Sequence, residues 1–164
     1  MKPINARLHQ ANSTNSGQPA QLSEETNRLF VYGTLLLDDV VKTLIDRVPN
    51  YQHAVALGWR IVCLPHRVYP GLVPGQGKSI GKIYTDLTDT EWATLNAFED
   101  PAYTLATVRV LLPSEIEGEA LSYVWRGSDH IDRPWSLADF GRDELIDYLS
   151  RCRSWRRRHE QRSS

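Results

Sequence analysis

The chain has 164 residues, of which 41% are hydrophobic and 24% are charged, and its formal net charge is −1. This length fits one domain that can bury a sizeable core without disulfide bonds or metal ions to stabilise it. The near-neutral balance argues against a whole-chain role in neutralising nucleic-acid phosphates. No apolar run is long enough to span a bilayer, and residues 1–21 lack the apolar core of a secretory signal. We therefore predict a cytoplasmic protein with no nucleic-acid or membrane partner, and the oligomeric state stays open.

Residues 1–27 are rich in Asn, Ser, Gln and Thr and show no apolar period, which predicts a disordered polar tail. The segment 28–32 (RLFVY) follows and is typical of a short buried strand that Gly33 stops. A helix over 38–48 comes next, because its apolar residues fall on one face and Asp38 is a suitable N-cap.

The middle of the chain is rich in predicted strands. The segments 54–64 and 79–87 have strand composition, and a Gly/Pro-rich stretch between them predicts a loop. Apolar residues alternate over 103–112, and 119–126 follows a predicted turn at Glu117-Gly118. These last two strands should therefore pair as a hairpin.

A final helix is predicted from near Ser136 to about Cys152. The domain should then cover 28–155 and leave a basic tail at 156–164. We interpret the tail's arginines as a solvated helix end, with an anion or RNA contact as the alternative. Strands outnumber helices and do not alternate with them, so the expected fold is α+β with a closed or strongly curved sheet.

Cysteines and histidines give no sign of a metal site. Cys63 and Cys152 are far apart without CxxC spacing, and we interpret them as free thiols of a reducing compartment. The five histidines show no ligand spacing. Neither GxGxxG nor GxxxxGK[ST] occurs, so the sequence gives no support for a nucleotide-binding loop of either kind.

One carboxylate falls on an apolar stripe. Thr88 and Glu91 form a capping-box pattern that starts a helix, and Trp92, Leu95 and Glu99 then share one face. Pro101 stops this helix, so Glu99 lies in its last turn, where burial and the helix dipole both raise the pKa of a carboxyl group. Such a group suits general acid/base chemistry. The alternative is a Glu99 that turns to water or pairs with an arginine such as Arg109.

The VYGTL segment (31–35) leaves the first strand through Gly33. Glycine allows a left-handed or tight turn and close approach of a ligand, and exposed N–H groups after such a turn can bind a carboxylate. Thr34 adds a hydroxyl donor. A plain structural turn is the alternative.

Six segments together resemble the gamma-glutamylcyclotransferase-like family, in particular its branch with plant avirulence-induced proteins and gamma-glutamylamine cyclotransferases. The resemblance covers about 28–155. The segments are FVYGTL (30–35), LGWR (57–60), YPGLVPGQGKSIGKIY (69–84), LNAFEDPAY (95–103), ALSYVW (120–125) and WSLADF (135–140).

The resemblance implies a small mixed β-barrel with flanking helices and a pocket at the barrel mouth. It implies an enzyme that releases 5-oxoproline from a gamma-glutamyl amine or peptide by intramolecular attack, with Glu99 as general acid/base and no metal or organic cofactor. Tyr32, Gly33, Thr34 and Leu35 would line the substrate loop, and Tyr103 and Tyr123 would shape the pocket.

Leu105 stands where the family often has an arginine, and this affects the expected charge preference for substrate. A binding or regulatory module that uses the same pocket is the alternative function. An amidohydrolase or other acyl-transfer enzyme using Glu99 is the next alternative. The leaving group and the exact substrate stay open.

Overall fold

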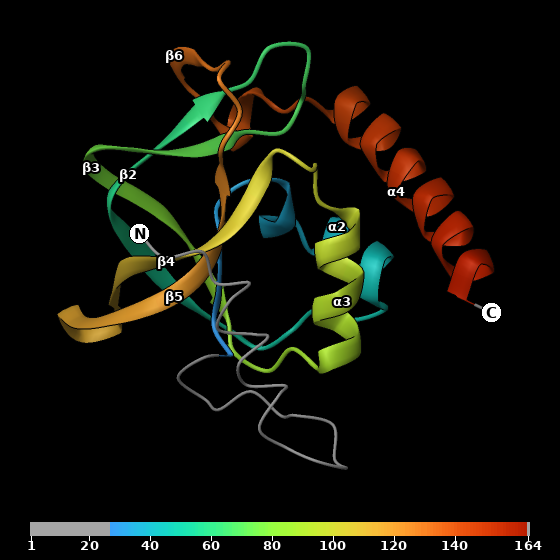
Figure 1. The fold of residues 1–164 in the computed structure, drawn as a ribbon, viewed down its shortest axis with the longest axis horizontal. Coiled ribbons are helices and arrows are strands. Elements are labelled where there is room, and N and C mark those ends of the chain that lie inside the picture. Colours follow the sequence, from blue (N-terminus) through green and yellow to red (C-terminus); the bar gives the residue numbers. More distant parts are fainter. Residues whose placement is uncertain (1–26, 164) are drawn as a thin grey trace.

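The computed structural model describes residues 27–163, so the predicted tail up to residue 26 and Ser164 lie outside the described residues (Figure 1). The strands are β1 (Leu29–Val31), β2 (Tyr51–Cys63), β3 (Gly71–Tyr84), β4 (Tyr103–Leu112), β5 (Ile116–Trp125) and β6 (Ile131–Pro134). The α-helices are α2 (Asp38–Ile45), α3 (Asp89–Phe98) and α4 (Arg142–Ser163). Short 3-10 turns are η1 (Thr34–Leu36), η2 (Pro113–Glu115) and η3 (Leu137–Asp139).

The strands form one mixed sheet in the order β3-β1-β5-β4-β2-β6, and β2 also pairs with β3. The pairings therefore run in a closed circuit through β3, β1, β5, β4 and β2, which is the connectivity of a small barrel, and β6 is added at one edge. The β1–β5 contact is parallel and the other ladders are antiparallel. The predicted α+β class is confirmed.

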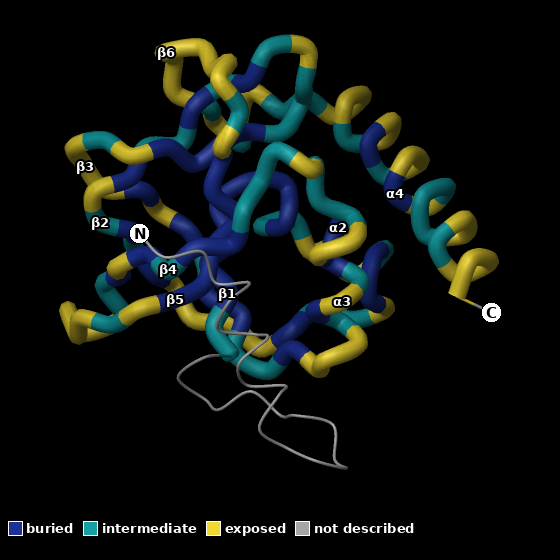
Figure 2. The backbone as a smooth tube through the Cα atoms, in the orientation of Figure 1, coloured by how far each residue is buried: buried dark blue, intermediate teal, exposed yellow. Residues whose placement is uncertain are grey.

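Strand β1 is buried on both faces because successive side chains point to opposite sides of a strand. Leu29 and Val31 pack towards the helices, whereas Phe30 and Tyr32 pack into the core inside the strand circuit. Helix α2 packs against both α3 and α4. The three helices lie on one side of the sheet, with α4 outermost (Figure 1), and exposed residues are frequent along α4 (Figure 2).

The Gly/Pro-rich stretch that predicted a loop is part of β3. Strand β3 begins at Gly71 and pairs with β2 through Pro74, with a register shift near Gly58, whose φ is 81°. A Cβ atom at Gly71 would lie 2.9 Å from the Cβ of Trp125, so this glycine permits close packing against β5. Pairing with β2 overrides the local turn propensity of the stretch.

Other boundaries also differ from the predicted ones. Leu37, not Asp38, is the N-cap of α2, and the helix ends at Ile45 rather than 48. The β4–β5 connection is η2, where Ser114 and Glu115 have positive φ, so Glu117-Gly118 lies inside β5. Helix α4 starts later than predicted and continues to Ser163, which makes residues 156–163 helical.

Candidate active site

A cavity of about 390 Å³ opens between the end of β1, the segment after α3, and α4. This volume lies in the range of pockets that bind small molecules. The structure brings every sequence-predicted site residue to this one cavity. They are Tyr32, Gly33, Thr34, Leu35, Glu99, Tyr103 and Tyr123.

Glu99 is the C-cap of α3 and not a residue of its last turn. Its backbone is extended (φ −66°, ψ 146°), and its N–H still donates to the Leu95 carbonyl at 3.1 Å. The side chain is half-buried, and within residues 27–163 it has no hydrogen bond or ion pair. The alternative pairing with Arg109 does not occur, because Arg109 binds Glu117 at 3.0 Å.

Burial raises the pKa of Glu99 to about 8, and the negative charge of Asp100 adds to the effect. Asp100 itself is partly buried, which opposes ionisation. It nevertheless keeps a lowered pKa because Tyr69 (2.6 Å), the Ala102 N–H (2.9 Å) and Arg67 (3.2 Å) donate to its carboxylate. Near neutral pH, Glu99 therefore favours its protonated form and the adjacent Asp100 favours its ionised form.

The phenol groups around Glu99 stay protonated. Burial raises the pKa of Tyr32 and of Tyr123, and the charge of Glu99 raises both further. The Tyr32 hydroxyl donates to the Tyr123 carbonyl at 2.5 Å, and the Tyr123 hydroxyl donates to Asn96 Oδ1 at 2.6 Å. The Tyr103 hydroxyl donates to the Pro70 carbonyl. These phenols are fixed donors, which leaves Glu99 as the group in this cluster that can exchange a proton near neutral pH.

Of the two predicted forms of the turn after β1, left-handed or tight, the structure has a tight one, the 3-10 turn η1. Gly33 has φ −126°, and a Cβ atom there would lie 2.6 Å from Cγ of Pro70. Glycine is therefore needed for packing against Pro70, and Gly33→Val would disturb the fold as well as any ligand contact. The N–H groups of Gly33, Thr34 and Leu35 have no acceptor in the described part of the chain. The Tyr84 hydroxyl donates to the Leu35 carbonyl at 2.6 Å and holds this loop in place.

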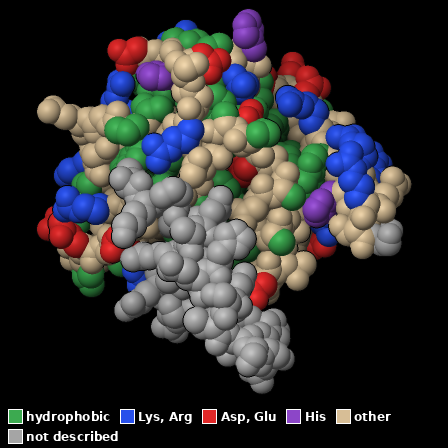
Figure 3. All heavy atoms as spheres, viewed as in Figure 1, with side chains coloured by type: hydrophobic (Ala, Val, Ile, Leu, Met, Phe, Trp, Pro, Cys, Tyr) green, Lys and Arg blue, Asp and Glu red, His purple; other side chains and the backbone are tan. Residues whose placement is uncertain are grey.

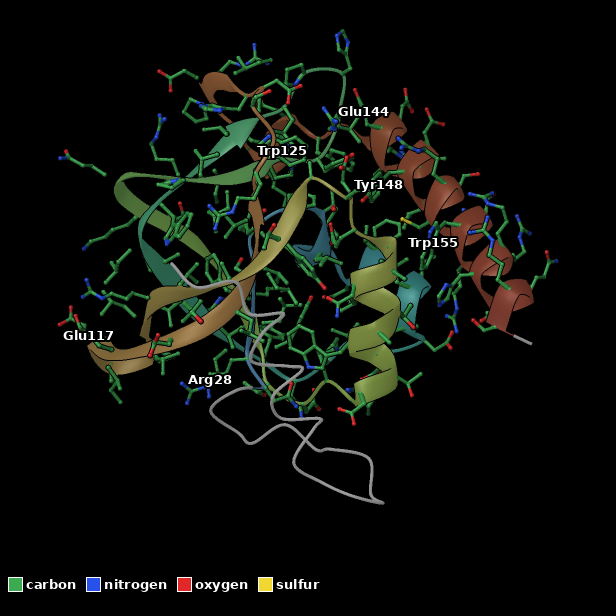
Figure 4. All side chains as sticks on the ribbon, in the orientation of Figure 1. Arg28, Glu117, Trp125, Glu144, Tyr148 and Trp155 are labelled. Carbon is green, nitrogen blue, oxygen red and sulfur yellow. The ribbon has the colours of Figure 1, made fainter. Side chains whose placement is uncertain are left out.

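Sequence reasoning missed the wall that α4 contributes to the cavity. Tyr148 lies 3.2 Å from the Thr34 hydroxyl, and Phe98 makes edge contacts with both Tyr148 and Trp155. Figure 4 shows Tyr148 and Trp155 on the side of α4 that faces the rest of the molecule. The sequence feature that could have indicated this contribution is the spacing of Tyr148, Cys152 and Trp155 (i, i+4, i+7), which places them on one helical face.

Leu105 is a core residue of β4. It is 3% exposed and packs in the cluster that contains Tyr123. Among residues 27–163, no group of three or more His, Cys, Asp or Glu side chains is placed to hold a metal ion. No helix in that range is long and apolar enough to cross a membrane.

This mixed α+β fold agrees with the comparisons with known proteins. Residues 29–141 match the family model described as gamma-glutamyl cyclotransferase, AIG2-like, and the chain belongs to that family. AIG2-like protein C of Arabidopsis thaliana is 36% identical over 126 residues, which are 74% of this chain and 73% of the relative. AIG2-like protein D of the same plant is 36% identical over 107 residues, or 63% of this chain and 70% of the relative.

Solved structures support the fold. A solution structure of an Arabidopsis thaliana protein superposes with a TM-score of 0.61 at 24% identity, covering 79% of this chain and 91% of that one. A second solution structure from the same plant has a TM-score of 0.60 at 23% identity, covering 92% and 89%.

Proposed function

We propose that the protein is a gamma-glutamyl cyclotransferase-type enzyme that releases 5-oxoproline from a gamma-glutamyl amine or peptide. The observation that carries the proposal is the Glu99 carboxyl group, which lines the cavity, has no hydrogen-bond or ion-pair partner among residues 27–163, and has a pKa raised to about 8. Membership of the gamma-glutamyl cyclotransferase, AIG2-like family supports the same reaction class.

The pKa of Glu99 matches the proton transfer that the reaction needs. The substrate's α-ammonium group must lose a proton before its nitrogen attacks the γ-carbonyl carbon, and α-amino groups have pKa values near 8. An ordinary glutamate would accept this proton at a cost of about 5 kcal/mol, since each pKa unit is worth about 1.4 kcal/mol. The ionised form of Glu99 accepts it at little cost.

The covalent steps then need no further protein group. The new C–N bond closes the five-membered ring and forms a tetrahedral intermediate. The bond from this carbon to the leaving nitrogen breaks as Glu99 returns its proton to that nitrogen. The second proton of the ring nitrogen then passes to Glu99 and from there to the released amine. The nucleophile and electrophile belong to one molecule, so the pocket contributes by folding the substrate into a reactive geometry.

The loop after β1 is the proposed site for the substrate's α-carboxylate. Gly33, Thr34 and Leu35 line the same cavity as Glu99, and their N–H groups have no acceptor among residues 27–163. Backbone donors of this kind bind carboxylates without a charged side chain. Tyr32, Tyr103 and Tyr123 would enclose the aliphatic part of the gamma-glutamyl group.

The test is 5-oxoproline release from a panel of gamma-glutamyl dipeptides and amines. Glu99→Gln keeps the size and polarity of the side chain but cannot exchange the proton, so turnover should fall by at least about a hundredfold. Glu117→Gln is the matched control, because Glu117 is an exposed glutamate of β5 that pairs with Arg109, and it should keep the parental rate.

Two results would contradict the proposal in different ways. A folded Glu99→Gln protein with near-parental turnover would remove Glu99 from the proton-transfer role. A parent protein that releases no 5-oxoproline from any compound in the panel would favour a small-molecule binding module over an enzyme.

A further inference from the structure

Helix α4 brings two arginines to the rim of the cavity. Arg151 and Arg158 both line it, two helical turns apart, which is about 10 Å along the helix axis. Ser154 and Trp155 line the cavity between them. Figure 3 shows Lys and Arg side chains gathered along α4.

Neither arginine is neutralised by the described part of the protein. The Arg151 guanidinium group lies 5.8 Å from the ring centre of Tyr148, and within residues 27–163 neither Arg151 nor Arg158 is part of an ion pair. Arg156 of the same helix is different, because Asp46 and Glu160 bind it. The rim therefore carries two arginines that form no ion pair with a carboxylate of residues 27–163.

The acidic groups of the cavity do not cancel this charge at neutral pH. Glu99 is largely protonated there, since its pKa is about 8. The Asp100 carboxylate is bound by Arg67 and Tyr69. The positive potential at the α4 rim is thus left for a ligand.

The position of the rim indicates which part of a ligand it would meet. Tyr148 contacts Thr34 of the loop, and Phe98, which precedes Glu99, packs on Trp155. The cavity therefore extends from the loop past Glu99 to the α4 rim, and its 390 Å³ leaves room beyond a gamma-glutamyl group. The atoms that lie beyond the scissile bond would reach Arg151 and Arg158.

We propose that the preferred substrates have a leaving group with an anionic end, such as the free carboxylate of an amino acid or peptide, which Arg151 and Arg158 bind. This rests on the proposed function of the cavity. A leaving amine with a positively charged end would be repelled by the same two arginines, whereas a guanidinium group pairs well with a carboxylate.

The experiment compares two substrates that differ in one charge, gamma-glutamylglycine and gamma-glutamylglycinamide. The kcat/KM of the parent should favour the carboxylate roughly fivefold, because two exposed ion pairs each contribute a modest factor. The double substitution R151Q/R158Q should bring this ratio close to one. The control R153Q/R157Q removes two exposed arginines of α4 that do not line the cavity, and it should keep the parental ratio.

A second measurement separates this inference from the proposed reaction. Calorimetry on Glu99→Gln protein compares the binding of the same two compounds, with and without R151Q/R158Q. Tighter binding of the carboxylate that R151Q/R158Q abolishes supports the inference even if the parent proves inactive. Equal binding of both compounds, binding of neither, or a preference that survives R151Q/R158Q overturns it.

Discussion

Glu99 and Asp100 show how neighbouring carboxyl groups acquire different chemistry from their surroundings. Asp100 has three donors and stays ionised, whereas Glu99 has none among the described residues and holds its proton. Glu99 could be chosen from the sequence, because its spacing from Trp92 and Leu95 places it on the buried face. The partners of Asp100 could not, because Arg67 and Tyr69 come from a loop distant in sequence.

The raised pKa of Glu99 predicts a pH-dependent stability. Folding raises this pKa from 4.5 to about 8, so between these values the native state binds more protons than the unfolded state. The contribution of Glu99 to the free energy of unfolding is therefore fully present below about pH 4.5 and is lost as the pH rises towards 8. Glu99→Gln should remove this slope and become more stable than the parent at pH 8, by on the order of a few kcal/mol. Urea denaturation at several pH values measures the difference.

Glu117→Gln serves again as the control, since Glu117 is exposed. Parallel stability curves for the parent and Glu99→Gln from pH 5 to 8 would mean that the Glu99 carboxyl is solvated in the folded protein.

Helix α3 begins where the sequence predicts. The Glu91 N–H donates to the Thr88 hydroxyl at 3.1 Å, and the Thr88 N–H donates to Glu91 Oε1 at 2.9 Å. Glu91 also accepts from Arg47 at 2.6 Å, which ties this helix start to the chain after α2. The capping box was predictable because all its atoms lie within four residues, whereas the Arg47 contact depends on the tertiary fold.

Removing the cap should destabilise the protein without changing the pocket. Thr88→Ala leaves an N–H of the first turn without its partner, and we expect a loss of about 1 kcal/mol in the free energy of unfolding. Thr94→Ala in the middle of the same helix is the control. Within residues 27–163 the Thr94 hydroxyl bonds only the Thr90 carbonyl, so its loss should change stability little. Thermal melts and urea titrations report both. Equal effects of the two substitutions would argue against a stabilising role for the cap.

The predicted strand boundaries are correct where apolar and polar residues alternate along the strand itself. They are wrong where pairing with a neighbouring strand determines the boundary. Strand β4 has its predicted bounds, 103–112, because apolar and polar residues alternate along it. The Gly/Pro-rich start of β3 follows β2 instead of its own turn propensity. The added strand β6 and the late start of α4 also depend on contacts that no local pattern encodes.

For the molecule as a whole, the predicted tail meets the fold at Asn27. Its side-chain amide donates to the Leu87 carbonyl at 2.9 Å and accepts from the indole N–H of Trp92 at 3.0 Å. The polar composition of residues 1–26 predicts that their deletion leaves the melting temperature nearly unchanged. Asn27→Ala in the shortened chain should cost about 1–3 kcal/mol, because the Trp92 indole N–H loses its partner. A fall of several degrees on deletion alone would show that residues before Asn27 contribute contacts.

The circuit of strands is complete without α4, which begins at Arg142, just beyond the residues that match the family model. Yet α4 supplies one side of the cavity, while the loop after β1 and Glu99 supply the other. Substitutions of the exposed α4 residues at its rim, Arg151 and Arg158, would therefore alter the outer part of the cavity and leave the strand pairings and Glu99 in place. In such an architecture, exposed side chains of one helix can set which molecules fit the cavity independently of the residues on its opposite side.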